Sequence, residues 1–378
     1  MVNQERLFKT FYDLLKINSP SQKEKAVADY ILGRFAKLGI AASTDNAGDA
    51  TGSDTGNVIA FIQGTKDGEP VLFNSHMDTI QPTTDLEIAE EEGIIKSGTN
   101  TILGADNKAG IAVLLEMIEV LKEQDIEHIP LEIAFTVCEE TGLFGASALD
   151  ISSLKSKMAF CFDGGGPAGY LIMQAPSQEI IEVDFKGKAV HAGIEPEKGA
   201  NAIYAASKAA ALFPQGRIDE ETTANLGLIE GGKATNIVAD KAMFKAEVRS
   251  QSPEKLEQVL AGIEKSVQDA IKETSVEADI KRHTAFTGFK LEKDEPVVEI
   301  ARKAMAEIGL SPSYTISGGG SDANVFNLKG IRTLTLSMGA QMAHSKEEFV
   351  VKEDLAKTAE LAVKMTEIVS NNPSLRGA

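Results

Sequence analysis

The stretch Val71-Leu-Phe-Asn-Ser-His-Met-Asp78 indicates how this chain folds. Its apolar start is typical of a buried strand, and a histidine and a carboxylate follow directly after it. In open α/β sheets, ligands gather at the carboxyl ends of the strands. The stretch therefore predicts an α/β sheet with polar chemistry along one edge.

Strands and helices alternate on both sides of this stretch. Strands are expected over residues 57–62, 131–138 and 158–162, and a helix is expected over residues 108–122. Alternation of this kind predicts a layered α/β sheet.

Two helices are expected before the first strand. Leu7, Phe11 and Leu14 recur at helical spacing, and a second apolar run of this kind ends at Gly39. Ser21 and Glu24 precede that second run at the spacing of a capping box. We therefore expect their side chains to cap the start of the second helix.

The pattern changes after about residue 178. Three segments alternate polar and apolar residues, as in a sheet with one face in water: residues 179–185, 225–229 and 238–248. Helices fall between them, an order that predicts an antiparallel α+β unit.

The α/β pattern resumes after residue 285 with a helix over 296–308 and further strands. Residues 178–285 are therefore predicted to form a domain inserted into a catalytic domain made of residues 1–177 and 286–378.

The composition excludes several classes of function. The chain has 378 residues, and its 38 lysines and arginines are outnumbered by 56 aspartates and glutamates, which gives a formal net charge of −18. Such a field repels nucleic acid phosphates and anionic membrane surfaces. We therefore expect neither nucleic acid nor a membrane as a partner.

The sequence also indicates the cellular compartment of the protein. Its first residues lack the unbroken apolar run of a secretion signal, and glutamates interrupt the most apolar run, residues 111–121. The two cysteines, Cys138 and Cys161, stand in apolar strand-like segments and are expected to be buried, reduced thiols. We therefore expect a cytoplasmic location.

Side chains that bind metals follow the ends of the predicted strands. They are His76, Asp78, Asp106, Glu139, Glu140, Asp163 and His344. Each alone is a weak signal, but all could converge on one edge of one sheet. Two histidines with several carboxylates suit a pair of divalent cations, with zinc the leading candidate and cobalt or manganese as alternatives.

Spacing suggests how these residues divide the work. Asp78 stands two residues after His76, so in an extended segment its carboxylate can orient the imidazole. Glu139 and Glu140 are neighbours whose side chains diverge at a strand end, so one can bind a metal while the other stays free as a base. Metal-assisted hydrolysis of an amide needs this combination.

Two glycine runs, residues 164–166 and 318–320, raise the question of phosphate binding. The first lacks the spacing of a nucleotide-binding loop, and Pro167 removes an amide donor. The second precedes a helix expected near Ser321, whose amides could receive a substrate carboxylate. Gly319 and Ser321 are therefore candidate substrate-binding residues, although plain turn chemistry explains the run equally well.

Taken together, these segments resemble the superfamily of zinc aminoacylases, carboxypeptidases and peptidase T, and they are most similar to its peptidase T branch. The resemblance covers almost the whole chain in the same order. Its strings are His76-Met-Asp78-Thr, Leu103-Gly-Ala-Asp106-Asn-Lys-Ala-Gly, Glu139-Glu140-Thr-Gly, Phe162-Asp163-Gly, Lys188-Ala-Val-His191-Ala-Gly, Asn201-Ala-Ile, Gly231-Gly-Lys-Ala-Thr-Asn236-Ile-Val, Arg249, Gly319-Gly-Ser321-Asp322-Ala and His344.

The resemblance implies a fold and a metal arrangement. The fold would be a three-layer α/β catalytic domain of the zinc-peptidase kind, with an inserted α+β, ferredoxin-like lid that also forms dimers in many relatives. One metal would be held by His76 and Asp163 and a second by Glu140 and His344, with Asp106 bridging the two.

The resemblance also implies the remaining roles. Glu139 would be the general base and acid, and Asp78 would support the first histidine ligand. In the inserted domain, His191, Asn236 and Arg249 would reach the substrate carbonyl or carboxylate. In dimers of the family, a histidine at the place of His191 can act on the partner subunit's site.

By this resemblance the chain is expected to be a zinc-dependent metallopeptidase that removes the N-terminal residue of short peptides, above all tripeptides, and to form a homodimer through the lid. Two features depart from the peptidase T pattern: Asn107 replaces a common aspartate, and the stretch from Thr79 to Gly104 is short. Strict tripeptide selectivity is therefore the expectation that these residues support least.

Two alternatives remain open. One is a related amide hydrolase with the same metals, such as an N-acyl amino acid deacylase, a dipeptidase or a carboxypeptidase. The other is a catalytically silent binding protein on the same fold.

Overall fold

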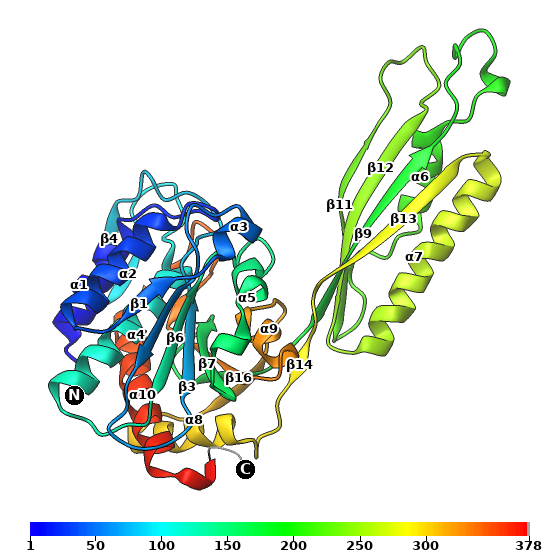
Figure 1. Ribbon diagram of the computed structural model, residues 1–378. Coiled ribbons are helices and arrows are strands. Elements are labelled where there is room, and N and C mark those ends of the chain that lie inside the picture. Colours follow the sequence, from blue (N-terminus) through cyan, green and yellow to red (C-terminus); the bar gives the residue numbers. More distant parts are fainter. Residues whose placement is uncertain (376–378) are drawn as a thin grey trace. The chain divides into compact units, whose positions relative to one another are not determined.

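The computed structural model describes residues 1–375, and their contacts divide the chain into two compact units (Figure 1). Unit 1 comprises Met1–Gln174 together with the chain from Lys290 onward, and unit 2 comprises Ala175–Phe289. The sequence placed these boundaries at residues 178 and 285.

A nine-stranded mixed sheet forms the centre of unit 1. Its main order is β1-β2-β6-β3-β7-β16-β8-β14, with β15 paired to β8. The middle strands β6, β3, β7 and β16 run parallel, whereas β2 pairs with β6 and β8 pairs with β16 in the antiparallel sense. In chain order the strands are β1 (Ala42–Thr44), β2 (Val58–Ile62), β3 (Val71–His76), β6 (Leu131–Thr136), β7 (Met158–Gly164), β8 (Tyr170–Ala175), β14 (Phe289–Lys290), β15 (Ser313–Ile316) and β16 (Arg332–Ser337).

Helices cover both faces of this sheet (Figure 1). The helices of unit 1 are α1 (Gln4–Leu15), α2 (Lys25–Lys37), α3 (Ala47–Thr51), α4 (Ala105–Glu123), α5 (Phe144–Ala148), α8 (Pro296–Glu307), α9 (Asp322–Leu328) and α10 (Lys352–Asn371), with short 3₁₀ turns at Ile151–Ser153 and Pro373–Leu375. α4 packs on β3 and β7 between α1 and α10, and α9 packs on β3, β7 and β16. The predicted layered α/β fold is confirmed.

Strands β3 and β6 are buried along their whole length, which explains their continuous apolar sequence pattern. A small second sheet, which the sequence did not predict, lies beside them in unit 1. It has the order β17-β18-β5-β4, with β4 (Ile88–Glu91), β5 (Ile94–Ser97), β17 (Ala340–Gln341) and β18 (Phe349–Val351).

The predicted capping box at the start of α2 is wrong. Glu24 occupies the N-cap position, but its side chain makes no capping hydrogen bond, and the first amide of the helix, that of Lys25, donates to Asp54 Oδ1 at 2.9 Å. The Ser21 hydroxyl instead donates to the Asp78 carboxylate, 2.6 Å away, and the Glu24 carboxylate accepts from the Cys138 amide at 3.0 Å. The side chains of Ser21 and Glu24 therefore bind residues that are distant in sequence and do not cap the helix.

Unit 2 is an antiparallel five-stranded sheet of order β10-β11-β12-β9-β13. Its elements are β9 (Ser177–Lys186), a 3₁₀ turn at Pro196–Lys198, α6 (Ala202–Ala211), β10 (Gly216–Arg217), β11 (Thr222–Gly231), β12 (Lys241–Ser250), α7 (Pro253–Thr274) and β13 (Glu277–Phe286). Both helices pack on this sheet and on each other, as the α+β prediction requires.

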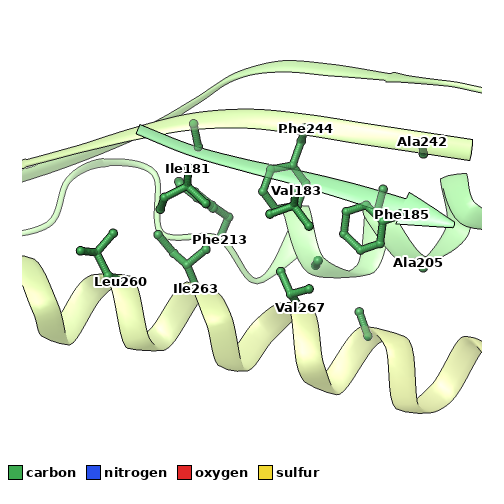
Figure 2. Packing of buried hydrophobic residues seen from close by; sticks show 14 of the residues in the cluster. Ile181, Val183, Phe185, Ala205, Phe213, Ala242, Phe244, Leu260, Ile263 and Val267 are labelled. Atoms are coloured by element: carbon green, nitrogen blue, oxygen red, sulfur yellow. The ribbon is translucent and has the colours of Figure 1, made fainter. Parts of the chain in front are cut away.

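The core of unit 2 follows from strand alternation. From Glu179 to Phe185 every second residue of β9 is buried, and Figure 2 shows Ile181, Val183 and Phe185 among the side chains packed between the sheet and α7. From α7, Leu260, Ile263 and Val267 fill the same core. The intervening residues of β9 point to the other face, so unit 2 has a hydrophobic core of its own.

The two chain crossings between the units are paired strands. In unit 1, the Leu291 amide donates to the Met173 carbonyl at 2.8 Å, and in unit 2 the Gly288 amide donates to the Ser177 hydroxyl at 2.7 Å. The chain therefore leaves unit 1 and returns to it along neighbouring segments.

Among the described helices, none combines the length and apolar character that crossing a bilayer requires. Both cysteines are buried and unpaired, as expected.

Candidate metal centre

Five of the predicted ligand residues gather at the carboxyl edge of the parallel strands. His76 ends β3 and Asp163 lies near the end of β7. Glu140 follows β6, Asp106 lies in the first turn of α4, and His344 follows β17. His76 and Asp163 lie where their strands end, Glu140 and His344 follow the ends of β6 and β17, and Asp106 lies where α4 begins.

Asp106 lies at the centre of the group. Its Oδ1 is 3.1 Å from Nε2 of His76, and its Oδ2 is 3.5 Å from Nε2 of His344. One carboxylate therefore faces two imidazoles, each through a different oxygen, which is the arrangement that a bridging ligand needs.

Each imidazole also faces a second carboxylate. His76 Nε2 is 3.2 Å from Asp163 Oδ1, and His344 Nε2 is 2.8 Å from Glu140 Oε2. Donor atoms of His76, Asp106 and Glu140 lie within 4.8 Å of one another, close enough to hold a metal ion.

The electrostatics of the group are those of a site built for cations. Burial raises the pKa of the Asp163 carboxyl to about 7, against the opposing effect of His76. Hydrogen bonds with Asp106 and Glu140 raise the pKa of His344 to about 10. Burial also favours neutral Asp106, but hydrogen bonds from His344 and His76 nevertheless hold its pKa below the usual value. Bound cations would neutralise this concentrated negative charge.

The donor set fits a metal pair on a further observation. The Oε1 atom of Glu140 is buried and has no hydrogen-bond partner among residues 1–375, although an unsatisfied buried carboxylate oxygen is costly. Imidazole nitrogens and carboxylate oxygens are donors that zinc, cobalt and manganese all accept.

Glu139 differs from its neighbour. Its Oε2 lies 4.0 Å from the nearest imidazole nitrogen, that of His76, beyond hydrogen-bond distance. Burial, together with the charge of Asp163, raises the pKa of Glu139 well above its usual value. A carboxylate that binds protons this readily and stands beside a metal-binding group suits a general base and acid.

Asp78 has more partners than the sequence suggested. The Asp78 carboxylate lies 3.3 Å from Nδ1 of His76, but the carbonyl oxygen of the same residue is closer, at 3.0 Å. The two carboxylate oxygens accept from the amides of Glu139 and Glu140 at 3.0 and 3.2 Å. Asp78 thus contacts both the first histidine and the turn that carries the two glutamates.

The candidate residues of unit 2 fall into two groups. His191 and Ile237 form a β-bridge, and the Ala192 amide donates to the Asn236 carbonyl at 2.9 Å, so His191 and Asn236 lie together beyond the end of β9. Arg249 pairs with Gln178 at the start of β9, where its guanidinium binds Glu247. Residues 241–249 of β12 span about 26 Å at the usual strand rise of about 3.3 Å; Arg249 lies at one end of this stretch, and Asn236 precedes the other end.

Gly319 and Ser321 belong to the segment before α9. Ser321 is buried and is the N-cap of that helix, with its amide donating to Asn324 Oδ1 at 3.1 Å. The Gly319 amide donates to the Ser317 hydroxyl at 3.0 Å. Both residues therefore have local structural roles, consistent with the turn chemistry considered from the sequence.

Comparison with known proteins identifies the family. A sequence profile described as "Peptidase family M20/M25/M40" matches residues 72–367, more than half of the chain and all of the metal-ligand candidates. The chain belongs to this family. As an M20 protein it is a metallopeptidase.

Individual relatives agree with this assignment. The M20 chain is 42% identical to the uncharacterized protein YqjE of Bacillus subtilis, over 97% of its own length and 99% of that protein. It is 27% identical to peptidase T of Listeria monocytogenes, over 88% of its own length and 81% of that protein.

Solved structures show the same fold. Aminopeptidase PepT of Bacillus cereus is 42% identical, with a TM-score of 0.88 over 98% of this chain and 100% of the other. A tripeptidase of Staphylococcus aureus is 34% identical, with a TM-score of 0.92 over the same shares of the two chains. The resemblance to peptidase T that the sequence motifs indicated is confirmed.

Sequence reasoning missed several residues that hold the M20 site together. The side-chain Nδ2 of Asn107 donates to Asp163 Oδ1 and to the Phe162 carbonyl, both at 2.8 Å. Glu348, buried below the centre, accepts from the amides of Gly104 and Asp106 at 2.7 and 2.9 Å. The sequence signal for Asn107 was its place directly after Asp106, whereas Glu348 gave none.

Proposed function

We propose that this M20 chain is an aminopeptidase that releases the N-terminal residue of short peptides, with tripeptides as the leading substrates. The observation that carries the proposal is the pair of imidazole–carboxylate couples joined by Asp106, with Glu139 beside them. Two of the solved relatives are an aminopeptidase and a tripeptidase, and this supports the choice of peptide substrate.

The centre would hold two divalent cations, most simply zinc, with cobalt or manganese as alternatives. His76 and Asp163 would hold one cation, Glu140 and His344 would hold the other, and Asp106 would bridge them. When bound, such a pair polarises the scissile carbonyl and lowers the pKa of water.

The chain's own residues would then move the proton. Glu139, raised in pKa and free of an imidazole partner, takes a proton from the attacking water and returns it to the leaving amine nitrogen. Asp78 keeps the Glu139 amide in place while it does so. Burial of Glu139 limits exchange of that proton with bulk water.

Substrate contacts would come from both units. Gly319 and Ser321 in unit 1, and His191, Asn236 and Arg249 in unit 2, would bind the peptide's carbonyl or carboxylate groups. Arg249 lies near one end of β12, whose residues 241–249 span about 26 Å, and His191 bridges Ile237 before the other end of that strand, so we do not expect a short peptide to touch both in one copy. This supports the proposal that His191 serves the site of a second copy.

The surface of unit 2 supports a homodimer. β10 pairs only with Thr223 and Ala224, so within the described chain the rest of β11 has no strand partner on that side. Large apolar side chains are exposed on β11 and on α6: Leu228, Ile229, Ile203 and Tyr204. An open strand edge beside exposed apolar residues is a typical pairing surface.

The principal alternative is an N-acyl amino acid deacylase, a dipeptidase or a carboxypeptidase with the same metals. We also propose a cytoplasmic location, in keeping with the buried, unpaired thiols of Cys138 and Cys161.

A peptide panel separates these activities. The purified protein, loaded with zinc or cobalt, is given free, N-acetylated and C-amidated di- and tripeptides, and the released residue is identified. Release of the first residue from free tripeptides, lost on N-acetylation and on chelation, is the expected result. Cleavage of the N-acetylated peptides would exclude the aminopeptidase in favour of the acyl-amide hydrolases.

A further inference from the structure

The turn after β6 directs three consecutive main-chain amides at buried carboxylates. The Cys138 amide donates to Glu24 Oε1 at 3.0 Å. The Glu139 and Glu140 amides donate to the two oxygens of Asp78 at 3.0 and 3.2 Å. Successive amides turned to one side form a concavity that binds anions. Here the anions are side chains of the protein itself.

Glu24 is fully buried, and several donors converge on it. Besides the Cys138 amide, Oε1 accepts from the Gln22 amide at 2.9 Å and from the Cys138 thiol at 3.4 Å. Oε2 accepts from the Ser53 hydroxyl. Glu24 therefore joins the segment before α2 to the first residue of the turn. Hydrogen bonds to an ionised acceptor are stronger than neutral ones.

Ser21, from the same segment, holds the other carboxylate. Its hydroxyl donates to Asp78 Oδ2 at 2.6 Å, the oxygen that also accepts from the Glu140 amide. The main chain supports this contact, because Pro20 and Thr79 form a parallel bridge and the Ser19 hydroxyl donates to the Met77 carbonyl at 3.0 Å. The segment of residues 19–24 is thus docked against the end of β3.

The turn needs such support because its backbone is unusual. Cys138 has φ = +52°, in the left-handed region that residues with a side chain seldom occupy. A non-glycine residue stays in that region only where its surroundings hold it there. The Glu24 carboxylate, bound to both the amide and the thiol of Cys138, provides that restraint.

We infer that Ser21 and Glu24 are positioning residues that fix the Glu139–Glu140 turn through its main-chain amides. Neither residue would touch the substrate: Glu24 acts through Cys138, and Ser21 acts through Asp78. The inference rests on the proposed function, because it assigns these residues to the placement of the base and of a metal ligand.

The same chain contains a matched control pair. Glu132 is also buried and accepts from the amides of Lys155 and Ser156 at 2.9 and 3.0 Å. The Ser156 hydroxyl donates to Glu132 at 2.6 Å, as Ser21 does to Asp78. Glu132 lies near the amino end of β6, away from the metal centre at the carboxyl end. Glu132 and Ser156 thus make the same kinds of hydrogen bond as Glu24 and Ser21, but away from the turn that carries Glu139 and Glu140.

The experiment compares Glu24→Ala and Ser21→Ala with Glu132→Ala and Ser156→Ala. Each variant is saturated with zinc and assayed on a free tripeptide for kcat, KM, metal content and thermal unfolding. We expect kcat to fall roughly ten- to a hundredfold in Glu24→Ala and about tenfold in Ser21→Ala, the effect usual for residues that orient metal-site groups. KM and metal content should stay near wild type, and both controls should retain kcat despite any loss of stability.

A conservative variant adds a test that a purely structural role would not pass. In Glu24→Gln, the amide oxygen can still accept from the Cys138 amide, so kcat should recover most of what Glu24→Ala loses. If Glu24→Ala fails to fold, Ser21→Ala and its control Ser156→Ala carry the comparison, because each removes only a hydroxyl group.

Several outcomes would overturn the inference. One is a kcat for Glu24→Ala and Ser21→Ala that matches their controls. Another is a loss of activity that is seen at limiting zinc but disappears at saturating zinc, since that would assign the residues to metal retention alone. A third readout is independent of peptide cleavage: the visible spectrum of the cobalt-loaded protein reports ligand geometry at the site. It should change in Glu24→Ala but not in Glu132→Ala. An inactive wild type with this spectral difference would refute the proposed function and leave the positioning role standing, whereas an unchanged spectrum would refute the positioning role.

Discussion

Glu139 and Glu140 have the same side chain and adjacent places in the chain, yet the structure gives them different partners. Glu140 Oε2 lies 2.8 Å from His344, whereas the nearest imidazole nitrogen to Glu139 is 4.0 Å away. Their amides share one anchor, Asp78, so the turn separates the side chains while holding the two backbones together. In the proposed mechanism, this difference in environment would leave Glu140 to bind a metal and Glu139 to transfer the proton.

Replacing the free carboxylate tests this division. Glu139→Gln should retain both metals and lower kcat by roughly two to four decades, the usual contribution of a general acid–base group. Metal analysis and steady-state kinetics on a free tripeptide measure the two effects separately. Glu140→Gln is the matched control. Its metal content should fall, whereas its kcat per bound metal should stay closer to the wild-type value. Near-normal turnover in Glu139→Gln would assign proton transfer to another group.

Sequence reasoning succeeded for residues whose own side chains are expected to do the chemistry. His76, Glu140, Asp163 and His344 were found because each follows a predicted strand, and Asp106 because it precedes a predicted helix; the structure brings all five together. Glu24 and Glu348 escaped because they act on main-chain amides of segments distant in sequence. Every residue except proline has such an amide, so these contacts leave no pattern in the sequence.

At the scale of elements, the long helix α4 determines where Asp106 lies. Asp106 is in its first turn, and Gly110, one turn later, packs directly against the end of β7. A Cβ at Gly110 would collide with the Phe162 carbonyl and with the Asn107 side chain, which itself holds Asp163. The close approach of helix and sheet therefore depends on this glycine.

Adding that methyl group should disturb both stability and the metal centre. Gly110→Ala should destabilise the protein by about 1–3 kcal/mol, as overpacking usually does, and weaken metal binding through Asn107. Gly33→Ala in α2 is the control, because a Cβ there meets nothing within 4 Å. It should stabilise the protein by about 0.5–1 kcal/mol by favouring helix. Denaturant unfolding measures the change in the free energy of unfolding of both variants. No change in Gly110→Ala would show that α4 can shift away from the sheet without cost.

The buried elements were easier to predict than the exposed ones. Strands β3 and β6 are buried throughout and stood out as apolar runs. The hairpin of β4 and β5 was missed because most of its residues are partly or fully exposed, so no apolar period marks it. The capping box at Ser21 and Glu24 matched a local motif, but partners elsewhere in the chain took both side chains.

At the scale of the whole molecule, the chain combines two units with separate cores. Unit 1 carries the metal centre, whereas the core of unit 2 is built between its own sheet and helices. A ligand that binds one folded unit stabilises that unit by mass action. Bound metal should therefore stabilise unit 1 more than unit 2.

Metal removal tests this independence. Chelation should lower the unfolding temperature of unit 1, and restored zinc should raise its unfolding free energy by about 4 kcal/mol at a thousandfold excess over Kd. The transition of unit 2 should stay in place. Calorimetry with and without chelator measures the unfolding temperatures of both units. Equal shifts of the two temperatures would show that the units unfold as one.

Complementation tests the proposed exchange of residues between copies. Glu139→Gln and His191→Ala should each be nearly inactive alone. When the two variants are co-expressed, random pairing of subunits should restore about a quarter of wild-type activity, the share of sites with both residues intact. No recovery, with mixed dimers verified by mass, would place His191 in the site of its own chain.

The paired crossings between the units have an evolutionary meaning. Because neighbouring strands lie only about 5 Å apart, the two ends of the inserted unit are almost in contact. A segment with adjoining ends can be gained, lost or exchanged by a single recombination event without altering the framework that receives it. Unit 1, with its metal centre, and the inserted unit 2 could therefore have diversified at different rates. New substrate ranges could arise by replacement of unit 2 while the catalytic chemistry of unit 1 stayed unchanged.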